Sequence, residues 1–360
     1  MNEQLDLFSF NTPKFKIDKP IRLIELFAGI GSQAAALRNL GADFTHYRCV
    51  EWDKYAMASY NAVHGTNFET NDIQKIHASD LGITETDKYC YIMTYSFPCQ
   101  DLSLAGNQKG MTKGSGTRSG LLWEVERLLD ECTELPQVLL MENVPQVIGK
   151  KNIKDFQSWR SKLESLGYSN FVQLLNAKDY GIPQNRNRCF MVSILGDYHY
   201  TFPVKQKLEL RLKDMLEDNV DEKYYLSDEA VKNFVINNEK NDLAEKGLRF
   251  DNRDSNQVGY IEKGTGQHQS NTIYSAEGCS RTIQATDWKD PQLVSHAIRG
   301  GGKRFSRQTS MGSCEGFVGD KEHQSNKVYG TEMARTIDAS EYKHPMMIHE
   351  NEEGKNKRNL

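Results

Sequence analysis

Short apolar runs alternate with longer helix-forming runs along the first half of the chain. The pattern predicts strands at residues 22–27, 47–50, 90–95, 138–141, 171–175 and 189–195. It predicts helices at residues 32–40, 54–63, 121–134 and 156–166. Strands that alternate with helices are typical of a parallel sheet covered on both faces. We therefore predict an α/β fold with a Rossmann-like, mostly parallel sheet and helices on both faces.

The pattern changes beyond about residue 205. One amphipathic helix is predicted at residues 205–217, and from Asn238 onward the chain is polar, rich in glycine and weakly periodic. This change predicts a first domain at residues 1–205 and a smaller, irregular, β-rich second domain at residues 206–360.

A short internal repeat lies in the second part of the chain. Arg281-Thr282-Ile283 recurs as Arg335-Thr336-Ile337, and an upstream His-Gln-Ser-Asn segment at positions 268–271 recurs at positions 323–326. Two copies are too few for a solenoid. The repeat predicts a pair of similar strand–turn modules within one small domain.

Composition narrows the class of protein. The 360 residues carry 45 Lys and Arg against 49 Asp and Glu, a net charge of −4, and 38% of them are hydrophobic. These values are typical of a globular protein and exclude collagen-like and disordered classes. No apolar run approaches the roughly 18 residues of a membrane-spanning helix, and residues 1–20 lack the apolar core of a secretory signal. The charge excludes a uniformly basic nucleic-acid-binding coat but allows a local basic surface.

The seven cysteines are scattered, odd in number and never paired as Cys-x-x-Cys. This spacing argues against a disulfide framework and against a zinc cluster, so we expect no metal and a reducing, cytoplasmic location. Most of these thiols are expected to be small buried hydrophobic groups.

A glycine-rich turn follows the first predicted strand. Gly29-x-Gly31-x-x-Ala34 stands between a strand and a helix, and Glu51 directly follows the next predicted strand. Glycines in such a turn let the backbone approach a ligand closely, and an acid at the end of the next strand accepts from ribose hydroxyls. The motif by itself does not separate a nicotinamide dinucleotide from another adenosine cofactor, and a tight turn without a ligand is the alternative.

Two further motifs stand where neighbouring strands end. Cys99 lies in Ser96-Phe97-Pro98-Cys99-Gln100, and Glu142 lies in Met141-Glu142-Asn143-Val144-Pro145. Open α/β sheets bind ligands at this carboxyl edge. A nucleophilic thiol beside a proton-handling carboxyl group suits attack on a conjugated ring whose nitrogen must be protonated. A buried structural thiol and a strand-end ion pair are the alternatives.

Together these segments resemble the DNA cytosine-5 methyltransferase family. The resemblance spans residues 21–195 in family order and is carried by Glu25-Leu26-Phe27-Ala28-Gly29-Ile30-Gly31, Glu51-Trp52-Asp53, Asp72-Ile73, Phe97-Pro98-Cys99-Gln100, Thr117-Arg118-Ser119-Gly120-Leu121, Glu142-Asn143-Val144 and Gln184-Asn185-Arg186-Asn187-Arg188. It implies S-adenosylmethionine as the cofactor and methyl transfer to C5 of a cytosine flipped out of duplex DNA.

The resemblance also implies roles for individual residues. Cys99 would add to C6 of the cytosine, and Glu142 would hold N3 and the exocyclic amine. Arg186 and Arg188 would position the ring carbonyl and the nucleophile. The implied cofactor-binding residues are Phe27, Ala28, Gly29, Ile30, Gly31, Glu51, Trp52, Asp72, Ile73, Pro98, Leu121 and Asn143.

Two stretches without acidic residues are expected to contact DNA. The first, residues 102–123, follows Cys99, and the second, residues 291–314, lies in the region that the resemblance assigns to target recognition. Solvated surface loops are the alternative for both. The expected DNA-binding residues are Gln100, Ser103, Lys109, Lys113 and Arg118 in or beside the first stretch, and Arg299, Lys303, Arg304 and Arg307 in the second.

The closing segments of the family, one resembling Arg-Leu-Gln-Gly-Phe-Pro and a helix containing Gly-Asn, are not found after residue 205. A split enzyme with a second chain, a truncated chain and a divergent end are three explanations. The expected partners are double-stranded DNA, a complementing chain and a cognate restriction endonuclease. Alternative functions are methylation of cytosine in transfer RNA, an inactive nucleic-acid-binding relic, and a nicotinamide dehydrogenase, which would leave the Cys99 and Glu142 motifs unexplained.

Overall fold

The computed structural model describes residues 12–102 and 109–216. Beyond them it describes the short segments 234–236, 257–261, 272–276, 278–282, 293–297, 303–307, 314–317, 327–330 and 347–349. The chain divides into two compact units, one formed by Met1–Leu175 and Asn187–Val204, the other by Asn176–Arg186 and Lys205–Leu360.

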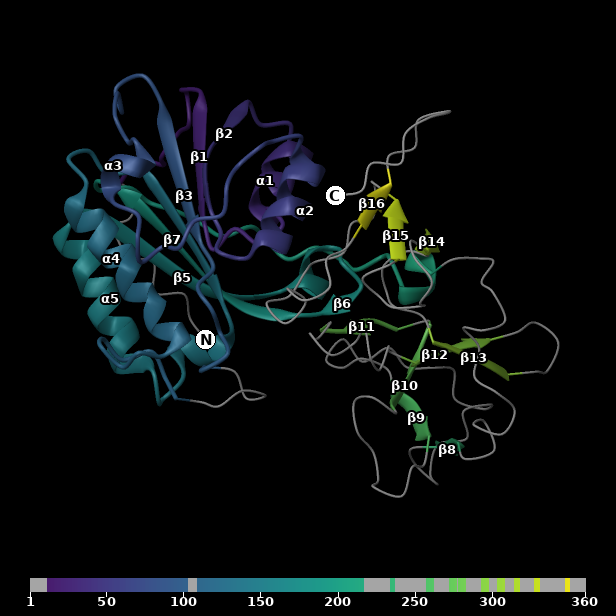
Figure 1. The fold of residues 1–360 in the computed structure, drawn as a ribbon. Coiled ribbons are helices and arrows are strands. Elements are labelled where there is room, and N and C mark those ends of the chain that lie inside the picture. The colour runs from purple at the N-terminus through teal and green to yellow at the C-terminus, as the bar shows by residue number, and fades with distance from the viewer. Residues whose placement is uncertain are drawn as a thin grey trace. The chain divides into compact units, whose positions relative to one another are not determined.

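A six-stranded sheet forms the centre of the first unit (Figure 1). Strands β2, β1, β3 and β4 are parallel to one another, whereas β7 runs antiparallel to β4. The predicted α/β fold with a mostly parallel sheet is confirmed. In spatial order the strands are β2 (Phe44–Val50), β1 (Ile21–Leu26), β3 (Cys90–Tyr95), β4 (Val138–Asn143), β7 (Asn187–Leu195) and β5 (Tyr168–Asn176).

Helices cover both faces of this sheet. Helices α1 and α2 lie on one side and α4 and α5 on the other (Figure 1). The four predicted helices are confirmed, with ends that coincide or differ by up to three residues. The bounds are α1 (Ser32–Asn39), α2 (Lys54–His64), α3 (Ala78–Leu81), α4 (Leu122–Glu131) and α5 (Ile153–Ser165).

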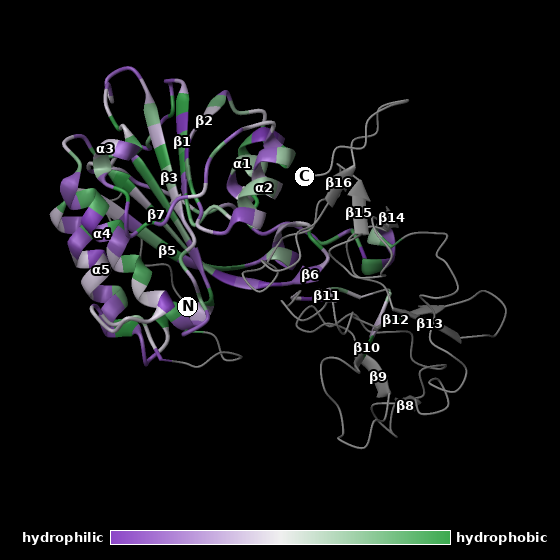
Figure 2. Ribbon diagram, in the orientation of Figure 1, coloured by the Kyte–Doolittle hydropathy of each residue, from purple (hydrophilic) through white to green (hydrophobic). Residues whose placement is uncertain are grey.

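The hydrophobic core is divided between the two faces by the alternation of side chains along the strands. Leu23 packs in one cluster with Ala34 of α1, whereas its neighbour Ile24 packs in another with Met93 and with Trp159 of α5. Successive side chains of a strand point to opposite faces, so a strand covered on both faces is buried along its length. Every residue of β3 is buried. Figure 2 shows strands that are mostly apolar between helices that carry both polar and apolar residues.

The strand order reverses direction at β1. The chain passes from β1 to β2 on one side and then returns to β3 on the other side. In doubly wound sheets, ligands bind at the carboxyl ends of the strands beside this reversal. The turns that follow β1 and β3 both lie at this edge, and the glycine motif and Cys99 belong to these turns.

The second unit contains the same strand arrangement twice. In each copy the first strand pairs antiparallel with the second across a register shift, and the second pairs parallel with the third. The first copy consists of β9 (Gln257–Ile261), β10 (Thr272–Ser275) and β12 (Leu293–Ala297), and the second of β14 (Cys314–Phe317), β15 (Lys327–Gly330) and β16 (Met347–His349).

The register of the two copies is equivalent. Ile273 pairs with Gly259 and with Leu293, and Val328, which holds the equivalent position in the second copy, pairs with Gly316 and Met347. The predicted pair of similar strand modules is therefore confirmed in its backbone pairing. The remaining strands of this unit are β6 (Gln184–Asn185), β8 (Phe234–Ile236), β11 (Ser280–Arg281) and β13 (Lys303–Arg307).

The single helix predicted at residues 205–217 is wrong. Up to residue 216, the described part of this range contains only a 3₁₀ turn, η5 (Leu212–Met215). The backbone amides of Leu212 and Lys213 donate to the carbonyl oxygens of Gly278 and Ala276. In a helix these two amides would donate to carbonyl oxygens four residues earlier in the chain. Here their hydrogen bonds to a distant segment outweigh the local amphipathic pattern.

None of the helices in the described parts of the chain combines the length and the apolar character that crossing a membrane requires.

Candidate active site

The turn after β1 has a left-handed backbone. The φ angle is +56° at Gly29, +78° at Gly31 and +58° at Phe27, where a side chain makes this conformation costly. A Cβ atom on Gly29 would meet no atom within 4 Å, whereas one on Gly31 would lie 2.6 Å from the Tyr60 ring. The turn therefore packs against α2 at Gly31 and has open space in front of Gly29.

Glu51, which follows β2, is held against this turn. Its two carboxylate oxygens accept from the backbone N–H groups of Gly29 and Asp53, each at 2.9 Å, and the residue is 8% exposed. Burial raises the pKa of Glu51, and the backbone donors act in the opposite direction. Next to it, Trp52 leaves 67% of its surface exposed. The structure thus brings together the glycine turn, an acceptor and an exposed aromatic ring.

A second acid, Glu25, is fully buried behind the same turn. Its carboxyl group accepts from the Tyr60 hydroxyl at 2.6 Å and from the Ala34 amide at 3.2 Å. Burial raises its pKa to about 7, although both hydrogen bonds favour the charged form. In the sequence, Glu25 stands out only as the first residue of a longer motif. The available signal was an acidic residue among the apolar residues at the end of the strand.

The other expected cofactor residues lie near the edge of the sheet or in the core. Ile73 is buried, and Asp72 is partly exposed with its carboxylate 3.8 Å from the Lys75 ammonium group. Pro98 and Leu121 are partly exposed. Their roles toward a cofactor stay predictions.

Cys99 lies partly exposed on the turn after β3. The carbonyl oxygens of the two residues before it are held by side chains from other segments. The Asn143 amide donates to the Phe97 carbonyl at 3.0 Å, and the Ser119 hydroxyl donates to the Pro98 carbonyl at 2.6 Å. The main chain that carries the thiol is therefore anchored from two directions.

Glu142 and Arg188 form an ion pair at the same edge. The distance from Arg188 Nε to Glu142 Oε1 is 3.0 Å, and the two side chains are 17% and 22% exposed. Tyr95 pairs with Met141, so the residues that follow β3 and β4 emerge side by side. Because β7 runs antiparallel to β4, its first residues, including Arg188, also reach this edge.

Three of the four predicted catalytic residues, Cys99, Glu142 and Arg188, thus stand on segments at the carboxyl edge of the sheet in the first unit. The fourth, Arg186, belongs to the second unit, where its amide donates to Asn176 Oδ1 at 3.0 Å. Its catalytic role stays a prediction.

Three of the residues expected to contact DNA in or beside the first stretch have partners within the first unit. Arg118 donates to Gln100 Oε1 at 3.2 Å, and Lys113 forms an ion pair with Glu126. Lys109 is exposed. Ser103 and Arg299 lie outside the described residues, and for Lys303, Arg304 and Arg307 only the main chain of β13 is described.

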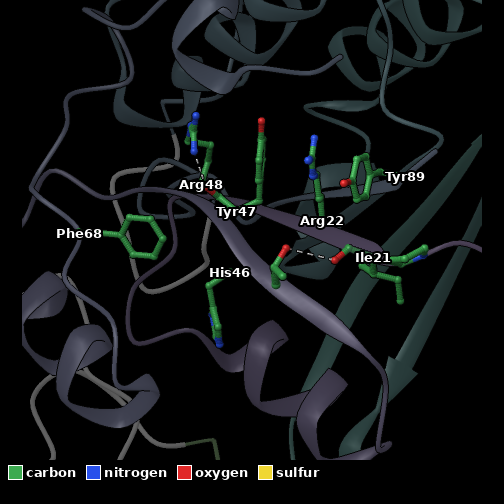
Figure 3. A pocket seen from close by; sticks show the side chains of 9 residues that line it. Ile21, Arg22, His46, Tyr47, Arg48, Phe68 and Tyr89 are labelled. Atoms are coloured by element: carbon green, nitrogen blue, oxygen red, sulfur yellow. Dashed lines mark hydrogen bonds between the residues drawn. The ribbon is translucent and has the colours of Figure 1, made fainter. Parts of the chain in front are cut away.

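A separate cavity of about 540 Å³ lies at the other end of β1 (Figure 3). The Arg22 guanidinium group lies 3.4 Å from the centroid of the Tyr89 ring and 4.6 Å from that of Tyr47, and it donates to the Tyr91 hydroxyl at 2.6 Å. Arg22 is the second residue of β1, whereas the glycine motif follows its last residue. The cavity is therefore distinct from the carboxyl-edge site. The contacts of Arg22 with the Tyr47 and Tyr89 rings connect β1 to β2 and to the segment before β3.

In the described parts of the chain, no three His, Cys, Asp or Glu side chains lie together in a way that could hold a metal ion.

The fold and the edge residues define a class of protein. It is a doubly wound α/β protein with a turn suited to a nucleotide-type cofactor beside a thiol and a paired carboxylate. The family model of the C-5 cytosine-specific DNA methylases matches residues 21–357. The chain therefore belongs to this family of methyltransferases, as its motifs predicted, and the dehydrogenase alternative has no support.

Characterised relatives include the type II methyltransferase M2.ScrFI of Lactococcus lactis subsp. cremoris, which is 36% identical over 266 residues, covering 60% of this chain and 73% of the relative. The type II methyltransferase M.SsoII of Shigella sonnei is 30% identical over 323 residues, covering 87% and 76%. Among solved structures, the Dnmt2 methyltransferase of S. pombe superposes with a TM-score of 0.53 at 18% identity, covering 78% of this chain and 77% of that one. The last likeness concerns the fold alone.

The buried carboxyl group of Glu25 predicts a pH-dependent stability. Its pKa rises from 4.5 to about 7 on folding, so between these values the folded state binds the extra proton and the free energy of unfolding falls as pH increases. The shift corresponds to about 3 kcal/mol. We expect Glu25→Gln to remove this part of the dependence, so that the variant gains about 3 kcal/mol relative to the wild type between pH 4.5 and 8.

Urea denaturation of both proteins across this pH range measures the difference. A stability difference that does not change with pH would show that Glu25 titrates normally.

Proposed function

We propose that the chain transfers a methyl group from S-adenosylmethionine to C5 of a cytosine flipped out of duplex DNA, through a transient bond between Cys99 Sγ and C6. The observation that carries this proposal is the meeting of the Cys99 turn and the Glu142–Arg188 pair at one edge of the sheet, beside the glycine turn. The membership of the chain in the C-5 cytosine-specific DNA methylase family supports it.

The glycine turn fits the adenosine part of S-adenosylmethionine. Open space in front of Gly29 allows a ligand to approach the backbone. The buried Glu51 carboxylate accepts from the Gly29 and Asp53 amides through different oxygens, and an ionised carboxylate has about four acceptor sites, which leaves acceptor capacity for ribose hydroxyls. The exposed Trp52 ring offers a stacking surface for adenine. When bound, the cofactor supplies an electrophilic methyl group, and this chemistry needs no metal.

The protein residues would work on the cytosine ring. C5 of cytosine is a poor nucleophile, and addition of the Cys99 thiolate to C6 turns C5 into an enamine carbon. In its protonated form, Glu142 would give its proton to N3, which neutralises the charge that addition places on the ring, and its other oxygen would accept from the exocyclic amine. Arg188 orients the Glu142 carboxylate through their 3.0 Å contact. After methyl transfer, loss of the C5 proton expels the thiolate and restores the aromatic ring.

Base flipping is a necessary step of this reaction. The thiol cannot reach C6 within a stacked duplex, and extrusion of the base costs a few kcal/mol that contacts in the pocket offset. Lys109, Lys113 and Arg118 on the segment after Cys99, together with Gln100 and Ser103, would contribute phosphate and base contacts. In the second unit this role would fall to Arg299, Lys303, Arg304 and Arg307.

Transfer RNA is the alternative substrate, and a cofactor-binding protein without methyl transfer is the non-enzymatic alternative. Tritiated methyl transfer to duplex DNA and to transfer RNA separates all three.

We further propose that a complementing chain and a cognate restriction endonuclease act with this protein in a bacterial or phage-infected cytoplasm. Full methylation by the purified chain alone at ordinary cofactor concentrations would refute the need for a complementing chain.

The thiol provides the decisive test of the mechanism. We expect Cys99→Ser to abolish methylated product while it keeps its affinity for the cofactor, because a hydroxyl is a far weaker nucleophile at neutral pH. Wild-type chain incubated with cofactor and duplex DNA containing 5-fluorocytosine should form a covalent complex that survives denaturing gel electrophoresis.

Cys132→Ser is the matched control, because Cys132 is also a partly exposed free thiol but lies at the end of α4. It should be trapped as the wild type is. Trapping of the Cys99→Ser variant, or its absence in the wild type even with the complementing chain, would contradict the mechanism.

Two glycines with the same backbone conformation test the cofactor site. Gly29 and Gly41 have φ angles of +56° and +67°, and a Cβ on either would meet nothing within 4 Å. Alanine at each position should cost about 1–2 kcal/mol of stability. We expect only Gly29→Ala to weaken S-adenosylmethionine binding, by roughly tenfold or more, because its methyl group would enter the space in front of the turn.

Isothermal titration with the cofactor and thermal melts of both variants provide the measurements. Equal cofactor affinity in the two variants would place the cofactor elsewhere.

A further inference from the structure

Two buried polar side chains near Cys99 have no role in the mechanism above. Ser119 is fully buried, and its hydroxyl donates to the Pro98 carbonyl at 2.6 Å. Asp101 is 7% exposed, and its Oδ2 accepts from the amides of Arg118 and Ser119, at 2.9 and 3.3 Å. Both residues belong to the first unit.

These contacts form a closed circuit around the thiol. The circuit leaves the turn at Asp101, passes through the Ser119 amide and hydroxyl, and returns to the turn at Pro98. Cys99 and Gln100 are the only residues enclosed along the chain between these two ends. The circuit therefore holds the backbone from Pro98 to Asp101, which carries the nucleophile, against η2 (Arg118–Leu121). This 3₁₀ turn leads into α4.

The circuit is costly to break. A buried acceptor or donor that loses its partner costs about as much as its desolvation, roughly 1–3 kcal/mol, and more when it is charged. The Asp101 carboxylate also lies at the start of η2, where backbone N–H groups without a partner inside the helix favour negative charge. Ser119 in turn has its amide held by Asp101, so its hydroxyl approaches Pro98 from one defined direction.

We infer that Asp101 and Ser119 are positioning residues for the Cys99 nucleophile. They touch neither the cytosine nor the cofactor, and they act by holding the main chain on both sides of the thiol so that Sγ lies at attacking distance from C6. This inference rests on the proposed function, because it concerns the same thiol. A displacement of a reacting atom by about 1 Å can cost 10²-fold in rate.

A purely structural role makes a different prediction. Residues that merely cap η2 would, when changed, lower stability and weaken cofactor and DNA binding together. Positioning residues would lower the rate of adduct formation while both affinities stay the same. The two roles are therefore separated by comparing the maximal rate of trapping with the concentrations of DNA and cofactor that give half of that rate.

The experiment measures single-turnover trapping of the full chain on duplex DNA containing 5-fluorocytosine, at saturating cofactor and DNA. We expect Ser119→Ala and Asp101→Ala to slow trapping by roughly 10- to 100-fold. The concentrations of DNA and of S-adenosylmethionine that give half the maximal trapping rate should stay within about threefold of the wild-type values. Asp101→Asn keeps an acceptor oxygen for the two amides and should recover at least half of the loss on a logarithmic scale.

Ser158→Ala is the matched control for removal of a serine hydroxyl. Ser158 lies exposed on α5, and its hydroxyl donates to the Lys154 carbonyl at 3.1 Å. It should trap at the wild-type rate. Circular dichroism and thermal melts identify any variant that does not fold, and Asp101→Asn then carries the test.

Two outcomes would overturn the inference: folded Ser119→Ala and Asp101→Ala variants that trap at the wild-type rate, or a loss of rate matched by an equal loss of cofactor and DNA affinity. Failure of the proposed function gives a different result, because the wild type itself would then form no adduct on either DNA or RNA.

Discussion

The parallel pairing of β3 with β4, extended by the antiparallel β7, is the constraint on which the site depends. Tyr95 and Met141 are partners, so the turn that carries Cys99 and the end of β4 that carries Glu142 emerge at one edge. The antiparallel direction of β7 brings Arg188 to that edge as well, 3.0 Å from Glu142. If β7 ran parallel to β4, its first residues would lie at the opposite edge and Glu142 would lose this ion pair.

Buried acids hold the turns at this edge in place. Glu51 accepts from the amide of Gly29, Glu25 from that of Ala34 and Asp101 from that of Ser119. A buried carboxylate is costly unless it is well hydrogen-bonded, and turns expose backbone N–H groups that need acceptors. Each acid therefore accepts from a backbone N–H group, in the glycine turn, in the first turn of α1 or at the start of η2, that has no partner within a helix or strand. Burial raises the pKa of Glu25 to about 7 even though two hydrogen bonds favour its charged form.

The second unit is built on a different principle. Its two strand modules share the same order, directions and register, and a register shift interrupts the antiparallel pair of each. Repetition of a module lets a small region with little hydrophobic periodicity specify its strands through local turns and pairing. Periodicity alone indicated little here, whereas the recurrence of the His-Gln-Ser-Asn segment, which directly precedes β10 and β15, indicated the modules correctly.

Much of the first unit follows from the sequence, because alternation of short apolar runs with helical ones is a local property. β3 was predicted at its observed bounds, and the glycine turn, Glu51, Cys99 and Glu142 were identified from their places after strands. The properties that depend on distant partners could not be predicted. The pattern did not indicate the direction of β7, the contact of Arg188 with Glu142, or the long-range hydrogen bonds that replace a helix at Leu212. Nor did it indicate Asp101 and Ser119, which look like ordinary polar residues in the sequence. Residue type and spacing determine which chemical groups stand at the strand ends, but only tertiary packing decides which buried acceptor meets which backbone donor, because those partners are far apart along the chain.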